Sequence, residues 1–181
     1  MDIESECIRA YRRHKHLRNA AKEVGIPWQT LYVHLRRSGE PVTGDKRRYG
    51  SSKDRLAAKA EQIFSGLVPG AIDQNRRCFQ SKVDFYVGDF SIDVKAARPR
   101  KGEKRYHSRR WAFSVKKQEA IADFFVCFCL MDDLSVKQTL LIPGEIARNY
   151  MTISVPETGG KWSDYAVATD QLNEFFQQIA A

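Results

Sequence analysis

The stretch over residues 82–95 constrains the fold most, because apolar and polar side chains alternate along it with a period of two. The apolar positions are Val83, Phe85, Val87, Phe90, Ile92 and Val94. The alternation breaks only at Gly88-Asp89, where a glycine followed by a small polar residue is typical of a two-residue hairpin turn of type II′. We therefore predict two antiparallel strands joined at Gly88, with all the apolar side chains on one buried face.

The other face of this hairpin gathers charges. A turn at Gly88-Asp89 pairs Val87 with Phe90, Phe85 with Ile92 and Asp84 with Asp93. Lys95 follows Asp93 on the same face. Opposed carboxylates on a sheet repel by roughly 0.2–1 kcal/mol at an exposed site, and a divalent cation between them removes that repulsion. Mg²⁺ binds a few carboxylate oxygens and completes its octahedron with water and substrate phosphate.

This combination of two acids and a lysine suits the hydrolysis of a phosphodiester. The reaction needs a stabilised hydroxide and a neutralised phosphate, which an ion and an ammonium group beside the attacking water provide. The other interpretation is an ordinary solvated hairpin face, because Asp and Lys are common on exposed strands. These residues alone leave both interpretations open.

The charge balance favours a polyanionic partner, because 30 Lys and Arg residues against 22 Asp and Glu residues leave a net charge of +8. The acidic start M-D-I-E-S-E lacks the apolar segment of a signal peptide. No apolar run reaches transmembrane length, so we expect a cytoplasmic protein without membrane contact. The cysteines Cys7, Cys78, Cys127 and Cys129 form no CxxC pair, which predicts reduced thiols in a core.

Residues 2–38 have the apolar spacing of a small helical unit. Within it, L-R-N-A-A-K-E-V-G-I-P-W-Q-T-L-Y-V-H-L-R-R has an Ala-Ala pair for close helix crossing and Gly25 for a turn between two helices. This segment resembles the helix-turn-helix of resolvases, invertases and related DNA-binding modules. The resemblance implies that the second helix presents Trp28, Gln29, Thr30, Tyr32, Val33 and Arg36 to a major groove, with Arg37 beside them. The alternative is a helical hairpin that caps another domain.

Two basic stretches lie outside these elements. Residues 39–52 are rich in Gly, Pro and Ser and contain Arg47 and Arg48, which predicts a basic linker lying along the phosphate backbone. The second stretch follows Lys95, and its side chains expected to grip DNA are Arg98, Arg100, Lys101, Lys104, Arg105, Arg109 and Arg110. Trp111 at its end is expected to stack on bases or sugars. The alternative for both stretches is a solvated surface.

The order of elements after residue 52 carries a second resemblance. A helix that contains Glu61 is followed by strands that contain Asp84 and then D-V-K, which ends at Lys95. The apolar run over 122–131 predicts a buried central strand, with residues 138–146 as its neighbour. This order resembles the PD-(D/E)xK nuclease superfamily, and within it small homing endonucleases and Holliday-junction resolvases. Val83 stands where that motif has its proline, which is its loosest member.

The resemblance implies both a fold and a site. The fold is α/β, with a mixed β-sheet flanked by helices in a restriction-endonuclease-like core over residues 53–181. It follows a small all-α helix-turn-helix domain over 1–38 and the linker over 39–52. The implied catalytic residues are Asp84, Asp93, Lys95 and Glu61. Asp84, Asp93 and the Val94 carbonyl are the implied ligands of Mg²⁺, for which Mn²⁺ is a substitute.

Together these features predict a Mg²⁺-dependent endonuclease, a hydrolase of double-stranded DNA, sequence-guided as in homing, mobile-element or phage enzymes. Cutting both strands takes two active sites, so we expect a homo-oligomer, either a dimer or a tetramer. Two alternatives stay open. One is a resolvase of branched DNA, and the other is a DNA-binding regulator that has lost catalytic activity.

Overall fold

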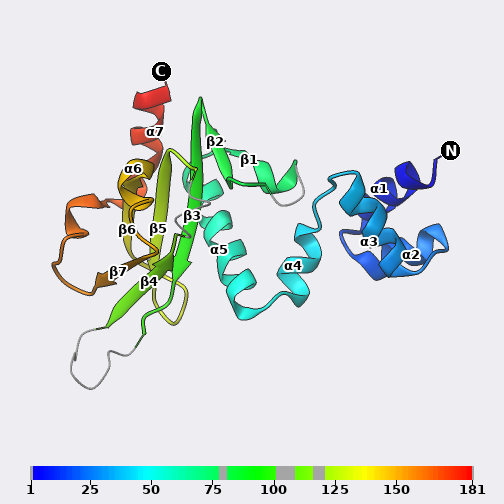
Figure 1. The fold of residues 1–181 in the computed structure, drawn as a ribbon, viewed down its shortest axis with the longest axis horizontal. Coiled ribbons are helices and arrows are strands. Elements are labelled where there is room, and N and C mark those ends of the chain that lie inside the picture. The colour runs from blue at the N-terminus through cyan, green and yellow to red at the C-terminus, as the bar shows by residue number, and fades with distance from the viewer. Residues whose placement is uncertain (1, 78–80, 101–108, 116–120, 181) are drawn as a thin grey trace. The chain divides into compact units, whose positions relative to one another are not determined.

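The computed structural model describes residues 2–77, 81–100, 109–115 and 121–180, which form two compact units (Figure 1). The first unit consists of residues 1–58 and 73–81, and the second of residues 59–72 and 82–181. Each unit has a hydrophobic core of its own.

Three helices build the core of the first unit: α1 (Ile3–His14), α2 (Leu17–Val24) and α3 (Trp28–Arg37). Its buried residues include Cys7, Tyr11, Ala20, Ala21, Leu31 and Leu35. Gly25 ends α2 with a φ of +77°, the left-handed backbone that allows the chain to turn into α3. The two helices and the glycine turn expected from the sequence are therefore present.

A fourth helix, α4 (Thr43–Tyr49), lies where the composition predicts a linker. Asp45 joins it to the first two helices, because its Oδ2 accepts hydrogen bonds from the Tyr11 hydroxyl at 2.8 Å and the Leu17 amide at 3.1 Å. The linker prediction over 39–52 therefore differs from the structure. Contacts between residues about thirty positions apart hold α4 in place, and local composition does not reveal them.

The border between the two units lies inside the helix α5 (Ser52–Leu67), after Ala58. The chain returns to the first unit through the end of β1 (Ile72–Asp73) and the 3₁₀ turn η1 (Gln74–Arg76). The first unit is thus larger than the helical domain predicted over 1–38, and it includes both α4 and η1.

A six-stranded sheet forms the centre of the second unit, with the order β1-β2-β3-β5-β6-β8. Its further strands are β2 (Phe85–Val87), β3 (Phe90–Ala97), β5 (Phe124–Leu130), β6 (Val136–Pro143) and β8 (Ala166–Val167). Strand β3 runs parallel to β5, whereas β2 pairs with β3 and β6 pairs with β5 in antiparallel fashion. The sheet is mixed, and β5 is the buried inner strand that the sequence predicts.

Aromatic side chains cover one face of this sheet. The C-terminal part of α5 supplies Phe64, whose ring centroid lies 4.9 Å from that of Phe85 and 5.8 Å from that of Phe176. Phe176 belongs to α7 (Leu172–Ala180) and is fully buried. Helices therefore flank the sheet, as expected for the predicted α/β class.

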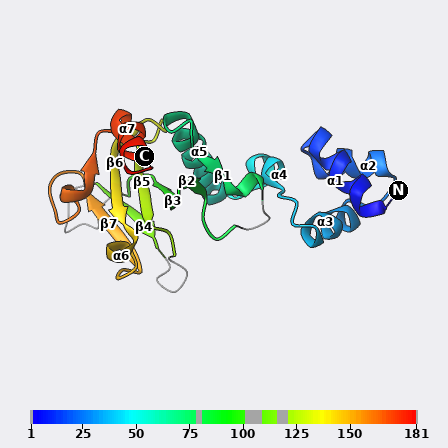
Figure 2. The same cartoon turned by 90° about the horizontal axis from the view of Figure 1, so that it is seen from above.

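A small second sheet covers the other face. Strand β4 (Arg110–Ser114) pairs with β7 (Thr152–Pro156), and their apolar side chains form one core with residues of β5 and β6. The short elements α6 (Gly144–Ala147), η2 (Ser163–Tyr165) and η3 (Thr169–Gln171) complete the unit. Figure 2 shows β5 and β6 between α7 on one side and β4 and β7 on the other.

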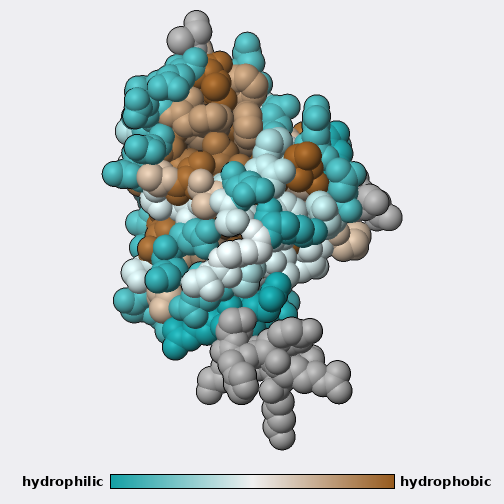
Figure 3. Space-filling view, turned by 90° about the vertical axis from the view of Figure 1, so that its left-hand side faces the viewer, coloured by the Kyte–Doolittle hydropathy of each residue, from teal (hydrophilic) through white to brown (hydrophobic). Residues whose placement is uncertain are grey.

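The surface in Figure 3 is hydrophilic over much of its area, with hydrophobic residues gathered in its upper part. Among the residues that the structure describes, no helix has the length and apolar character needed to cross a bilayer.

Candidate functional site

The hairpin of β2 and β3 has the predicted register at Phe85 and Val87, but the predicted pair of Asp84 with Asp93 is not part of the ladder, because β2 begins at Phe85. Phe85 pairs with Ile92, Tyr86 with Ser91 and Val87 with Phe90. Gly88 has a φ of +56°, and Asp89 does not share this positive φ, as a type II′ turn requires. Val83 departs from the predicted single apolar face. It belongs to the core beneath β4 and β7, because β2 begins only at Phe85 and the strict alternation starts there.

Asp84 lies against the backbone of β3. Its amide donates to the Ile92 carbonyl at 2.9 Å, and its Oδ2 accepts a hydrogen bond from the Val94 amide at 2.8 Å. The Val94 nitrogen belongs to the peptide bond that joins Asp93 to Val94. The Asp84 carboxylate therefore lies next to the backbone of Asp93.

Asp93 and Lys95 form an ion pair that is largely shielded from solvent. Lys95 Nζ lies 2.5 Å from Asp93 Oδ1, and the side chains are 30% and 16% exposed for Lys95 and Asp93 respectively. Asp93 pairs with Phe125 and Lys95 with Cys127 in the parallel ladder. Partners in a ladder direct their side chains to the same face, so the charged pair lies beside the core beneath β4 and β7.

One oxygen of the Asp93 carboxylate is buried and has the Lys95 ammonium as its cationic neighbour. Oδ1 is buried and accepts no hydrogen bond from any described residue. Its contact with Lys95 is an ion pair. Buried carboxylate oxygens are normally satisfied by a donor or a cation, so this atom suits a metal ligand.

The residues present fit a hard divalent cation. The Asp84 carboxylate accepts from the Val94 amide, and Asp93 is the residue that precedes Val94 in β3. Mg²⁺ is commonly held by one or two carboxylates, with waters and substrate phosphates completing the octahedron. Asp84, Asp93 and the Val94 carbonyl would hold the ion.

Glu61 is half-buried on α5 in the same unit. Within the described part of the chain, no three His, Cys, Asp or Glu side chains gather in a group that would hold a metal ion. The structure thus does not place Glu61 in one cluster with Asp84 and Asp93. Its role as the helix acid stays a prediction.

The cysteines beside the site are core residues. Cys127 and Cys129 are buried and form no disulfide, and Cys7 is buried in the first unit. Burial raises the pKa of the Cys127 thiol far above its ordinary value, and the negative charge of Asp93 adds to this shift. Burial likewise raises the pKa of Cys129 to about 12. Both thiols are therefore protonated and neutral at physiological pH. Cys78 lies outside the described residues.

A polar contact that the sequence does not reveal joins β3 to the start of β5. Asp123 Oδ2 accepts hydrogen bonds from the Ser91 amide at 2.8 Å and the Ser91 hydroxyl at 2.6 Å. These bonds stabilise the carboxylate and lower the pKa of Asp123. Ser91 and Asp123 are 32 positions apart in the sequence, so a local sequence pattern does not predict their contact.

Ser91→Ala is expected to raise the pKa of Asp123 toward 3.8, its ordinary value. Because the folded pKa is depressed, the contact stabilises the fold above the unfolded-state pKa, and this stability is lost as the pH falls through the folded pKa. The parent should therefore lose more stability than the variant as the pH falls below ~4, because the variant retains only the backbone bond to the Asp123 carboxylate. NMR titration of the Asp123 carboxyl measures the shift, and equal pKa values in both proteins would contradict the assignment.

The candidate DNA-reading residues on α3 lie mostly at the surface. Gln29, Thr30, Arg36 and Arg37 are exposed, as are Trp28 and Val33. Tyr32 differs, because it is half-buried and packs against the core of the first unit. Most of the predicted groove-facing side chains are thus accessible to a partner.

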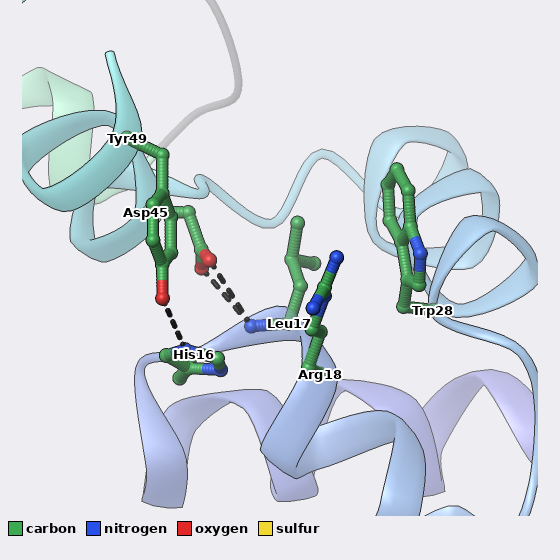
Figure 4. Close-up of a pocket in the computed structure, with 6 residues that line it drawn as sticks. All are labelled: His16, Leu17, Arg18, Trp28, Asp45 and Tyr49. Atoms are coloured by element: carbon green, nitrogen blue, oxygen red, sulfur yellow. Dashed lines mark hydrogen bonds between the residues drawn. The ribbon is translucent and has the colours of Figure 1, made fainter.

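The start of α3 borders a cavity of about 350 Å³ in the first unit. Its lining consists of His16, Leu17, Arg18, Trp28, Asp45 and Tyr49 (Figure 4). His16 Nε2 lies 2.7 Å from the Tyr49 hydroxyl, and Asp45 accepts from the Leu17 amide. These bonds fix α4 beside the start of α2.

The basic stretch after β3 is only partly described. Arg98, Arg100 and Arg109 are exposed, whereas Lys101, Lys104 and Arg105 lie outside the described residues. Arg110 is half-buried, and its Nε donates to the Ser154 hydroxyl at 3.0 Å. On α4, Arg47 and Arg48 are both exposed.

Trp111 is not available for stacking on DNA. Its side chain is fully buried, and its Nε1 donates to the Leu130 carbonyl at 2.8 Å. The expectation that Trp111 stacks on bases or sugars is therefore wrong. The alternation of β4 directs this ring into the core beneath β4 and β7.

Comparison with known proteins gives a likeness among solved structures. No protein-family model matches the sequence, and no curated protein matches it. Among solved structures, the fold is similar to that of a bacterial homing endonuclease, I-Ssp6803I, with 16% sequence identity and a TM-score of 0.47. The likeness covers 71% of this chain and 93% of the endonuclease chain.

Proposed function

We propose that this protein is a Mg²⁺-dependent DNA endonuclease whose active site is formed by Asp84, Asp93 and Lys95. The observation that carries the proposal is the buried Asp93 Oδ1, which accepts no hydrogen bond from the described residues and lies beside Lys95. The Asp84 carboxylate lies on the backbone of the same strand. Two acids and an amine on this hairpin suit phosphodiester hydrolysis better than a structural ion pair.

Each side chain has a distinct role in this proposal. Asp84 and Asp93, with the Val94 carbonyl, would hold the ion, and Glu61 is the predicted additional acid. The ion supplies Lewis-acid stabilisation of charge on the phosphate and a more acidic water. Lys95 donates N–H bonds that orient the attacking water and neutralise the phosphate oxygens. The apolar neighbours Phe125 and Cys127 limit solvent access from the core side.

Both units supply DNA contacts in the same proposal. Helix α3 enters the major groove, where Gln29 and Arg36 read bases by paired hydrogen bonds. Exposed arginines, among them Arg98, Arg100 and Arg109, bind phosphates. Such a protein cuts double-stranded DNA in a sequence-guided manner, as homing or mobile-element enzymes do. Cutting both strands takes two copies of the site, supplied by a dimer or tetramer.

A cleavage assay tests the proposal. The full-length protein is incubated with supercoiled plasmid, pooled genomic DNA and a four-way junction, with Mg²⁺, with Mn²⁺ or with EDTA. We expect nicked or linear products with either ion and none with EDTA. Cleavage of the junction alone would indicate a branched-DNA resolvase. Binding without cleavage under every condition would contradict the enzyme and indicate a DNA-binding regulator.

A further inference from the structure

The first unit contains a second cavity, of about 440 Å³, whose charged lining among the described residues is entirely basic. Lys15, Arg47, Arg48 and Arg76 line it together with Thr43. These side chains come from three separate segments. Lys15 lies between α1 and α2, Arg47 and Arg48 lie on α4, and Arg76 ends η1.

Close contacts between the first two segments build one wall of this basic cavity. Arg48 Nη1 donates to the Lys15 carbonyl at 2.5 Å. Gly44 allows this approach, because a Cβ at that position would lie 2.5 Å from the same carbonyl oxygen. The wall is therefore a packed junction between α4 and the α1–α2 connection.

The opposite wall is held by η1. The Thr43 hydroxyl donates to the Asn75 carbonyl at 3.2 Å. Arg76 Nε lies 3.0 Å from Asp73 Oδ2, which orients the guanidinium. Asp73 accordingly neutralises part of the charge of Arg76. Asp45 on α4 accepts hydrogen bonds from the Tyr11 hydroxyl and the Leu17 amide. Neither acid is among the residues that line the basic cavity.

Four cationic side chains around one cavity repel one another unless an anion lies among them. Arginine presents a planar fork of N–H donors that matches the oxygens of a phosphate, and lysine adds a point charge. The volume falls in the range of about 300–1,000 Å³ that is typical of ligand sites. A phosphate group is thus the ligand that the lining fits.

We propose that the basic cavity binds a phosphate of the DNA backbone, apart from any contact that α3 makes with bases. This inference rests on the proposed function, because it takes DNA as the source of the phosphate. It brings Lys15 and Arg76 together with Arg47 and Arg48 around a common ligand. Contacts of this kind position a protein on a duplex without reading its sequence.

A pair of charge-matched variants tests the inference. Lys15→Gln/Arg47→Gln removes two charges from the basic cavity, whereas Lys53→Gln/Arg55→Gln removes the same two residue types from exposed positions on α5. Arg48 is left unchanged because it donates to the Lys15 carbonyl. Binding to a labelled duplex is measured in EDTA over a range of salt concentrations, and melting temperatures verify folding.

For the cavity variant, we expect the slope of log K, the DNA-binding constant, against log salt concentration to be less steep. The magnitude of the slope should fall by about 1 for each DNA phosphate that the variant no longer neutralises. Its affinity should fall equally on unrelated sequences, and the α5 variant should retain the parent slope. An equal fall in affinity for both variants would overturn the inference and show a general charge effect only. Should the cavity variant unfold, Arg76→Gln compared with Arg55→Gln makes the same test at the opposite wall.

A second measurement separates DNA from free phosphate. Arginine side-chain N–H signals of the parent are followed by NMR during titration with a short duplex or with inorganic pyrophosphate. Saturable shifts of Arg47 and Arg76 with the duplex support the inference, and shifts with pyrophosphate alone would overturn it. If the parent cuts DNA and the two charge variants bind DNA with equal affinity, the basic cavity is not a phosphate site, and the proposed function is unaffected. A parent that neither binds nor cuts DNA refutes the proposed function itself.

Discussion

Asp93→Asn should lower the rate of DNA cleavage by roughly 100- to 1,000-fold, the effect that follows removal of one group that stabilises charge in a transition state. The change keeps the size of the side chain but removes its negative charge and one oxygen that suits a cation. Asp84→Asn and Lys95→Gln should lower the rate by a similar factor. Initial rates of plasmid nicking at saturating Mg²⁺ give the measurement.

The matched control for this experiment is Asp89→Asn. Asp89 lies in the turn of the same hairpin and is exposed, so the change in net charge is identical while the proposed site is intact. We expect this control to cut DNA at the parent rate. We also expect Asp93→Asn to bind DNA as the parent does, because the proposed phosphate contacts lie elsewhere.

Melting temperatures of the parent and the variant verify that the variant remains folded, because the Asp93–Lys95 pair is largely shielded from solvent. Undiminished cleavage by Asp93→Asn would remove this carboxylate from the active site. A fall in both cleavage and melting temperature would instead assign the Asp93–Lys95 pair to stability.

Two glycine substitutions in the second unit should change stability in opposite directions. Gly144 is buried where β6 meets α6, and its amide donates to the Asp123 carbonyl at 2.7 Å. A Cβ there would lie 2.0 Å from the Ala122 carbonyl oxygen. Because backbone atoms must shift to relieve this overlap, Gly144→Ala should cost about 2–3 kcal/mol. The melting temperature should fall by roughly 4–12 °C.

Gly66→Ala is the opposing case. Gly66 lies within α5, and a Cβ at that position would meet nothing within 4 Å. Alanine restricts the unfolded chain more than glycine and favours the helix, so we expect a gain of up to about 1 kcal/mol. Both positions belong to the second unit, and the same unfolding transition, followed by calorimetry, reports both. A Gly144→Ala variant as stable as the parent would show that the backbone around Ala122 is not tightly packed.

The sequence predicts the hairpin well because the information is local. The turn residues Gly88 and Asp89 and the period of two specify the register between Phe85 and Ile92, and the structure has that register. The helices around Gly25 are likewise predictable from spacing and from one turn residue. The apolar run over 122–131 predicts β5 because only an inner strand buries nearly every side chain.

The sequence is less informative where contacts span many residues. The docking of α4 depends on Asp45 meeting Tyr11, 34 positions earlier, and composition alone indicates a linker there. Trp111 follows a basic stretch and looks like a DNA contact, but its partner is the Leu130 carbonyl. Glu61 is a third example, because the motif indicates which acid on the helix to consider but does not determine its distance from the strands.

The primary sequence by itself determines which residues of the hairpin oppose one another and which elements form, since turn chemistry and side-chain period act over neighbouring positions. Only the tertiary structure decides the environment of the charges. The alternation of apolar and polar residues along β3 predicts that the face with Asp93 and Lys95 is exposed to solvent. In the folded chain β4 and β7 cover the same face of the sheet. Burial by distant strands is thus what distinguishes a candidate catalytic pair from two ordinary surface residues.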